Sequence, residues 1–168
     1  SAGMDEGDII EIRKTAIQPL ETSEELMARL AQLAAPLCAD TVRSIEAGTA
    51  PRIPQDNARA TYAPMLSKEE SPIDWNQPAR FIVDHVRGLV PWPVATAELG
   101  GTEFKIYRVE YADQKTEKAP GSVVALTKKG LLVACQEGNT VLVCELQAKG
   151  GKRMPAPDYF RGHPITIE

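Results

Sequence analysis

The chain has 168 residues, which is enough for one ordinary domain or two small ones. Apolar residues make up 43% and charged residues 25%, a globular composition that excludes a disordered or low-complexity chain. No run approaches the ~18 consecutive apolar residues of a membrane helix, and the acidic first residues lack the basic and apolar parts of a signal peptide. We therefore expect a soluble cytoplasmic protein with no membrane partner.

The cysteines, the histidines and the distribution of charge give further information about the class of protein. Cys38, Cys135 and Cys144 form no closely spaced pair and lie among apolar neighbours, so we expect buried, reduced thiols. His85 and His163 are too few and too scattered for a metal site, and no metal is expected. The first 71 residues carry 7 basic and 12 acidic side chains, whereas the rest carry 12 and 11. This asymmetry hints at two parts with different partners.

The first part of the chain predicts a strand followed by helix. Residues 9–17 are rich in β-branched residues with partial alternation, which favours a strand. Residues 22–25 match a capping box, and Pro36 should kink the helix that follows or begin a second one. The apolar residues at helical spacing are Leu26, Leu30, Leu33, Leu37 and Ile45. One strand and one or two helices cannot form an independent core, so we expect the end of a larger α/β domain.

The middle of the chain changes character. Residues 51–74 are rich in proline and polar residues and predict a surface linker, with a helical turn near Lys68. Residues 77–89 keep apolar residues at helical spacing, and Pro91 and Pro93 follow. This pattern predicts an amphipathic helix.

Beta structure is predicted for most of the remaining chain. The pair Gly100-Gly101 favours a hairpin between residues 96–99 and 102–111, with a register slip before Val109. Further short apolar runs, separated by glycine turns, cover residues 123–126, 131–135 and 140–146. Short strands at this spacing predict a small β-barrel or sandwich, and the length favours an OB-type barrel.

Lys149-Gly150-Gly151-Lys152-Arg153 places three cations around a double glycine. Glycines let a backbone approach a partner closely, and lysine and arginine neutralise phosphates. The alternative is a solvated hairpin tip. Aromatic residues are few, and Phe104, Tyr107 and Tyr111 serve equally well in a core, so phosphate contact is favoured over base stacking.

Several segments, in order, resemble the bacterial methionyl-tRNA formyltransferases. The matching segments are residues 4–10, 56–70, 73–75, 91–95, 150–154 and 158–163. The resemblance covers essentially the whole chain and implies an α+β protein in three parts. Residues 1–50 would be the C-terminal end of an α/β formyltransferase catalytic domain, 51–74 an interdomain linker, and 75–168 a C-terminal OB-like tRNA-binding domain.

The resemblance also implies a reaction. The family transfers a formyl group from 10-formyltetrahydrofolate to the amino group of initiator methionyl-tRNA. Its asparagine, its histidine and its folate-contacting loop would lie before Ser1, and Asp5 matches the carboxylate beside them. Glu6 stands where threonine is usual. We expect this fragment to be inactive alone and to hold no folate, whereas the intact enzyme would be a monomer.

The tRNA-binding residues implied are Lys68, Lys149, Lys152 and Arg153. Lys68 matches a family lysine associated with the acceptor end of tRNA, while Met65 replaces a second lysine found in many members. Both Asp5 and Lys68 have a simpler alternative, that of solvated surface residues.

Two other functions remain open. A formyltransferase acting on another amine, such as a sugar nucleotide, would not be expected to carry the segments 150–154 and 158–163. An OB-type binding module without catalysis would have no need of residues 1–48.

Overall fold

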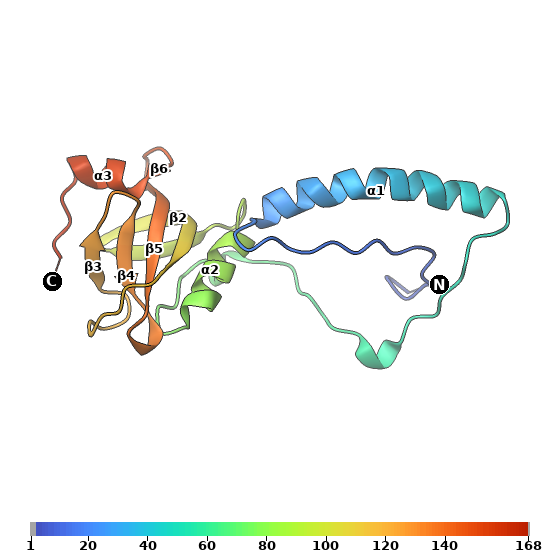
Figure 1. Ribbon diagram of the computed structural model, residues 1–168, viewed down its shortest axis with the longest axis horizontal. Helices are drawn as coiled ribbons and strands as arrows, with labels where there is room; N and C mark the ends of the chain where they lie inside the picture. Colours follow the sequence, from blue (N-terminus) through green and yellow to red (C-terminus); the bar gives the residue numbers. More distant parts are fainter. Residues whose placement is uncertain (1–2, 168) are drawn as a thin grey trace. The chain divides into compact units, whose positions relative to one another are not determined.

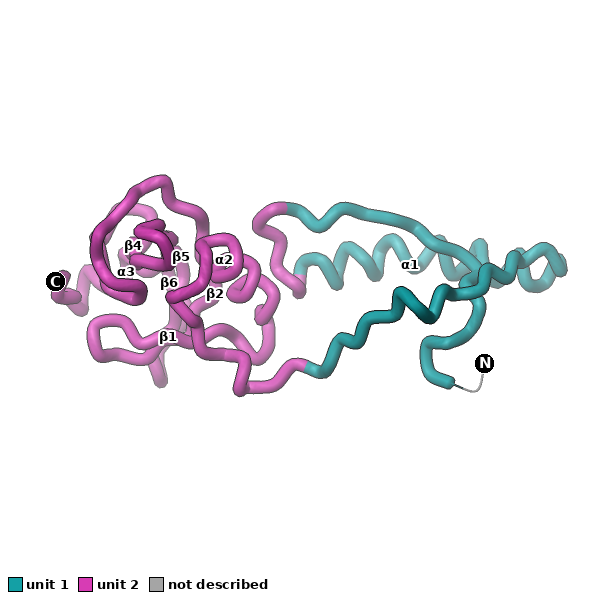
Figure 2. Tube along the Cα trace, turned by 90° about the horizontal axis from the view of Figure 1, so that it is seen from below, with its two compact units in different colours: residues 1–18, 25–65 teal, residues 19–24, 66–168 magenta. Residues whose placement is uncertain are grey.

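The structure, a computed structural model, describes residues 3–167 and divides into two units (Figures 1 and 2). Unit 1 consists of Ser1–Gln18 and Glu25–Met65, and unit 2 of Pro19–Glu24 and Leu66–Glu168. The helices are α1 (Ser23–Glu46), α2 (Ala79–Gly88) and α3 (Ala156–Gly162), with short 3-10 helices η1 (Asn57–Arg59), η2 (Lys68–Glu70) and η3 (Gln136–Gly138). The strands are β1 (Ala95–Leu99), β2 (Thr102–Ala112), β3 (Val123–Leu126), β4 (Leu131–Ala134), β5 (Thr140–Ala148) and β6 (Met154–Pro155).

Unit 1 is built on α1, which begins directly after Thr22 and continues through Pro36 as one helix. Residues 9–17 run extended along it, where the Arg29 guanidinium donates to the Ala16 carbonyl at 2.8 Å. They form no strand, so that prediction is wrong. Ile9 makes only an isolated antiparallel bridge with Ile53. A β-branched run becomes a strand only where a neighbouring strand can satisfy its backbone groups, and the described part of unit 1 offers none.

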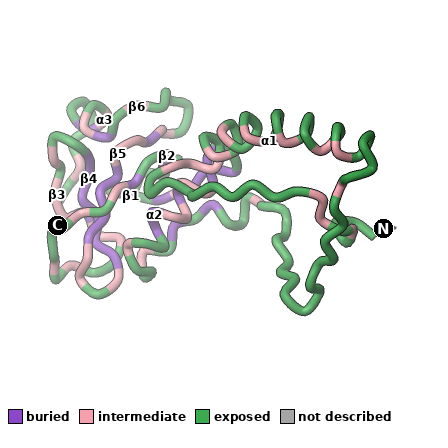
Figure 3. The backbone as a smooth tube through the Cα atoms, turned by 45° about the vertical axis from the view of Figure 1, so that its right-hand side comes forward, coloured by how far each residue is buried: buried purple, intermediate pink, exposed green. Residues whose placement is uncertain are grey.

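None of the described residues of unit 1 is buried (Figure 3). In α1, Leu26, Leu33 and Leu37 are half-buried, whereas Leu30 is 38% and Ile45 53% exposed. The predicted apolar stripe therefore exists but meets no sheet within unit 1. The expectation of buried thiols fails at Cys38, which is exposed on this helix.

Unit 2 contains an antiparallel sheet with the order β1-β2-β5-β4-β3, and β6 pairs with β5 (Figure 1). The β1–β2 hairpin turns at Gly100 and Gly101, whose φ angles of 58° and 76° suit glycine. The predicted slip is present, because the pairing of β2 with β5 shifts on both sides of Arg108. Among the described residues β1 and β3 do not pair, so the sheet is open and a closed OB-type barrel is not confirmed.

The core lies between the sheet and its helices. The helix α2 buries Ile82, Val83 and Val86 at the spacing of one helical face and packs against β2. Phe104 of β2 meets Phe160 of α3 edge-to-face, with ring centroids 5.8 Å apart. Each such buried side chain contributes about 1.5–3 kcal/mol.

After residue 65 the chain returns to unit 2, where its first helical element is η2, the turn predicted near Lys68. A capping box fixes it: the Ser67 hydroxyl accepts from the Glu69 amide at 3.3 Å, and the Glu70 carboxylate accepts from the Ser67 amide at 2.8 Å. The next residues join the sheet, because the Ile73 amide donates to the Thr96 carbonyl of β1 at 2.9 Å. Across residues 3–167, no helix combines the length and apolar character needed to cross a membrane.

Candidate nucleic-acid interface

The predicted cations lie in the turn between β5 and β6. We call residues 149–153 the basic turn. All five of its residues are exposed, and β6 folds back onto β5 beyond them. Gly150 has a φ of 76°, and the Gly151 amide donates to the Ala148 carbonyl at 2.9 Å. The double glycine therefore makes a tight turn that presents Lys149, Lys152 and Arg153 to the solvent.

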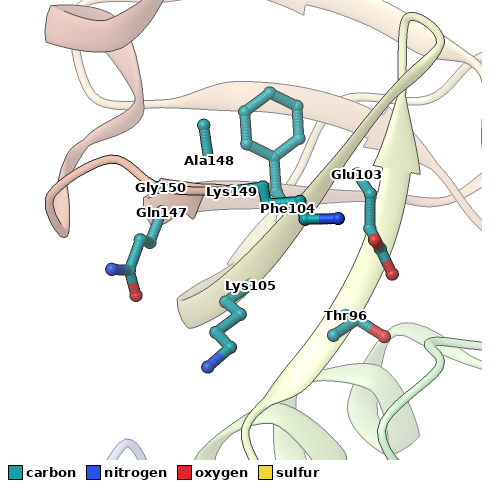
Figure 4. Close-up of a pocket in the computed structure, with 8 residues that line it drawn as sticks. All are labelled: Thr96, Glu103, Phe104, Lys105, Gln147, Ala148, Lys149 and Gly150. Carbon is teal, nitrogen blue, oxygen red and sulfur yellow. The ribbon is translucent and has the colours of Figure 1, made fainter.

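A pocket of about 330 Å³ opens beside the basic turn (Figure 4). Its lining residues are Thr96, Glu103, Phe104, Lys105, Gln147, Ala148, Lys149 and Gly150. Lys105 of β2 pairs in register with Thr96 on one side and Gln147 on the other, and Figure 4 shows it pointing away from the core residue Phe104. Lys105 thus adds a cation that the sequence analysis missed, partly offset by the acidic Glu103.

Arg153 is the most constrained cation of the basic turn. Its Nη2 lies 2.6 Å from the Glu145 Oε2, and its guanidinium carbon lies 4.4 Å from the centre of the Tyr107 ring. The hydrogen bond to Glu145 raises the pKa of Arg153, so the side chain stays charged. A guanidinium carries five N–H donors, so the bond to Glu145 leaves donors for a phosphate.

Two polar side chains lie behind the basic turn. The Tyr107 hydroxyl donates to the Gln147 Oε1 at 2.8 Å, and the Gln147 Nε2 donates to the Gly151 carbonyl at 2.9 Å. Both Tyr107 and Gln147 are half-buried, on β2 and β5. The backbone of the turn is therefore tied to the sheet by side chains as well as by strand pairing.

The other predicted site residues lie elsewhere. Lys68 is exposed at the start of η2 in unit 2. Asp5 is exposed in unit 1 with a φ of 60°, and its carbonyl accepts from the Gln55 side chain at 2.7 Å. Unit 1 contains no histidine, since His85 and His163 both belong to unit 2. Over residues 3–167, no group of three His, Cys, Asp or Glu side chains could hold a metal ion.

The sequence has clear relatives. Residues 65–164 match the family described as formyl transferase, C-terminal domain. A methionyl-tRNA formyltransferase from Moorella thermoacetica is 42% identical over 163 residues, which cover 97% of this chain and 52% of that protein. One from Solibacter usitatus is 44% identical over 165 residues, covering 98% and 52%. The chain spans about half the length of the curated relatives it matches.

Solved structures show a similar fold. HypX from Aquifex aeolicus in complex with tetrahydrofolic acid has a TM-score of 0.72 at 17% identity, covering 100% of this chain and 30% of HypX. An N-formyltransferase from Helicobacter canadensis has a TM-score of 0.63 at 15% identity, covering 84% and 51%. At these identities the likeness concerns the fold alone. On the match over residues 65–164, the chain belongs to the formyl transferase family and carries its C-terminal domain.

Proposed function

We propose that the chain is the C-terminal part of a cytoplasmic methionyl-tRNA formyltransferase. The intact enzyme would transfer a formyl group from 10-formyltetrahydrofolate to the amino group of initiator methionyl-tRNA. The observation that carries the proposal is that relatives with this name match 97–98% of the chain, across both units. The fold neighbour in complex with tetrahydrofolic acid supports a folate-derived donor.

In this proposal residues 75–168, as an OB-like domain within unit 2, supply the tRNA-binding surface together with Lys68 of the linker. Lys149, Lys152 and Arg153 would contact phosphates, and Lys68 would contact the acceptor end. The support is geometric: the three cations of the basic turn are exposed together, and Lys105 and Lys149 line the adjacent pocket. Phosphate contacts of this kind release counterions and position the RNA without reading its bases.

Asp5 would act in the chemical step of the intact enzyme. When the amine attacks the formyl carbon, negative charge develops on the formyl oxygen, and preorganised donors must stabilise it. A carboxylate can orient a neighbouring histidine and help to accept the amine proton. Asp5 is exposed, and unit 1 has no histidine. Both facts fit the proposal that unit 1 does not itself supply the histidine and the donors to the formyl oxygen.

The test is a titration of the 168-residue chain with initiator tRNA at several salt concentrations. We expect a Kd of about 10⁻⁴–10⁻⁶ M, in the range of non-specific binding. Three neutralised phosphates give a slope of log affinity against log salt of roughly −2 to −3, taking ~0.7–0.9 per contact. The double variant Lys152→Ala/Arg153→Ala should make this slope shallower by up to about 2.

The chain offers a matched control. Lys128 and Lys129 are an exposed pair of cations at the β3–β4 turn, so Lys128→Ala/Lys129→Ala removes the same charge from another hairpin tip. We expect it to leave the slope nearly unchanged. If Lys152→Ala/Arg153→Ala binds with the affinity and salt slope of the unmodified chain, as the control should, the basic turn is only a solvated tip. Lys68→Ala would then be the next variant to titrate.

A further inference from the structure

The side chains behind the basic turn form a continuous chain of contacts. Tyr107 contacts Gln147, Gln147 contacts Gly151, and Arg153 returns to the Tyr107 ring. We propose that Tyr107 and Gln147 are positioning residues that hold the basic turn in the shape that binds RNA phosphates. The inference rests on the proposed function and assigns a role to two residues that carry no charge and need not contact RNA.

Hydrogen-bond chemistry fixes the orientation of the Gln147 amide. The Gly151 carbonyl can only accept, so the amide nitrogen of Gln147 must face it. The Gln147 oxygen then faces Tyr107, whose hydroxyl donates. The flipped orientation would lose the bond to Gly151, because two oxygens would then face each other, whereas the Tyr107 hydroxyl could still accept from the amide nitrogen.

Tyr107 acts on both ends of the turn. Its hydroxyl holds Gln147, two residues before Lys149, and its ring lies under Arg153, the last residue of the turn. Arg153 is also bound by Glu145, whose Oε2 lies 2.6 Å from the Arg153 Nη2. Lys152 lies between two anchored neighbours, because Gly151 is held through both its amide and its carbonyl. These anchors on either side should limit the backbone freedom of Lys152, whose side chain is exposed.

This arrangement lowers the cost of binding. A free glycine-rich turn would lose backbone freedom when it closes on a phosphate, and that loss would weaken the complex. A turn already held in the free protein avoids most of it. Removing one hydrogen bond of the chain should therefore weaken RNA binding without removing any phosphate contact.

The variants separate positioning from charge. Tyr107→Phe removes only the hydroxyl and keeps the ring under Arg153, and Gln147→Met keeps the length of the side chain but loses both bonds. Tyr111→Phe is the matched control, because Tyr111 lies on the same strand, is 50% exposed, and shows no hydroxyl hydrogen bond within residues 3–167. Each variant is titrated with initiator tRNA at several salt concentrations, and its melting temperature is measured.

We expect Tyr107→Phe to weaken tRNA binding about three- to tenfold, the effect of one net hydrogen bond. Gln147→Met should weaken it at least as much, because it loses both bonds. Their salt slopes should match that of the unmodified chain, whereas Lys152→Ala should make the slope shallower by about 0.7–0.9. The double variant Tyr107→Phe/Lys152→Ala should lose less binding free energy than the sum of the losses in the two single variants. The reason is that Tyr107 acts partly through Lys152. Tyr111→Phe should bind normally.

Other results overturn the inference. Normal binding by both Tyr107→Phe and Gln147→Met would show that the contacts serve folding alone. Additive losses in the double variant would show that Tyr107 does not act through Lys152. If the unmodified chain fails to bind tRNA, the proposed function itself fails, a result distinct from normal binding by the variants.

Discussion

The Arg87 guanidinium of α2 donates to the carbonyl of Glu21 at 3.0 Å, across 66 residues of sequence. Nearby, the Ser23 hydroxyl donates to the Val90 carbonyl. These bonds explain why residues 19–24, which include the first two residues of α1, belong to unit 2 although the rest of α1 lies in unit 1. The compact unit that carries the basic turn is therefore discontinuous in sequence.

Replacing Arg87 should loosen this segment. Arg87→Met removes the bond to Glu21 and the ion pair with Asp84, and we expect the free energy of unfolding to fall by about 1–2 kcal/mol. Cleavage after Glu21 by a glutamate-specific protease should accelerate. The control is Arg80→Met on the same helix, whose side chain is 82% exposed and lies 3.6 Å from Asp84. That variant should change stability by less than about 0.5 kcal/mol, and equal effects of the two would contradict the anchoring role.

The 168-residue chain should show no formyl transfer by itself. Asp5 is exposed, and unit 1 supplies no histidine to stabilise the charge on a formyl oxygen. The measurement is an assay with 10-formyltetrahydrofolate and charged initiator tRNA, beside a full-length methionyl-tRNA formyltransferase as positive control. Turnover comparable to the control would refute the assignment of unit 1 as an incomplete catalytic part.

Gly130 should tolerate no side chain. A Cβ at this position would lie 2.4 Å from the Val143 carbonyl oxygen and 3.0 Å from the Leu142 side chain, both on β5. Gly130→Ala should therefore destabilise unit 2 by about 1–3 kcal/mol, measured by urea unfolding. At Gly162 a Cβ would meet nothing within 4 Å, so Gly162→Ala is the control and should be nearly neutral. A neutral Gly130→Ala would mean that β4 and β5 can separate without cost.

Stability should fall at alkaline pH through Cys144. Burial, followed by the charge of Glu110, raises the pKa of Cys144 to about 11. An unfolded thiol has a pKa of about 8.5, so the stabilisation is complete below that pH and is lost as the pH rises toward 11. Urea unfolding across this window should show a shallower decline for Cys144→Val than for the unmodified chain. Cys38→Ala, at an exposed thiol, should leave the profile unchanged.

The elements that were predicted correctly are those whose formation is determined by residues close to one another in the sequence. The hairpin at Gly100-Gly101, the helix predicted over residues 77–89 and the turn at Lys68 follow from local rules about glycine, apolar spacing and capping. The strand predicted for residues 9–17 failed because a β-branched pattern does not tell whether a partner strand is present. Closure of the barrel depends in the same way on pairing between distant strands.

The candidate site shows the same limit. The basic turn could be recognised because its cations are contiguous in sequence. Lys105 could not, since it reaches the site only through the pairing of β2 with β5, opposite Gln147. The contact of Arg153 with Tyr107 likewise depends on β6 folding back toward the sheet. An alternating pattern predicts that Lys105 faces outward, but not which strand lies beside it.

The uneven burial of the chain has a calorimetric consequence. Every buried residue among those described lies at or after Ser71. The heat capacity of unfolding grows with the apolar surface exposed and is about 1.2–1.5 kcal/mol/K for a 100-residue domain, against about 2.0–2.5 kcal/mol/K expected from a fully packed chain of 168 residues. A calorimeter should therefore record the smaller value, so that the molecule melts with the heat-capacity increment of a protein little more than half its length.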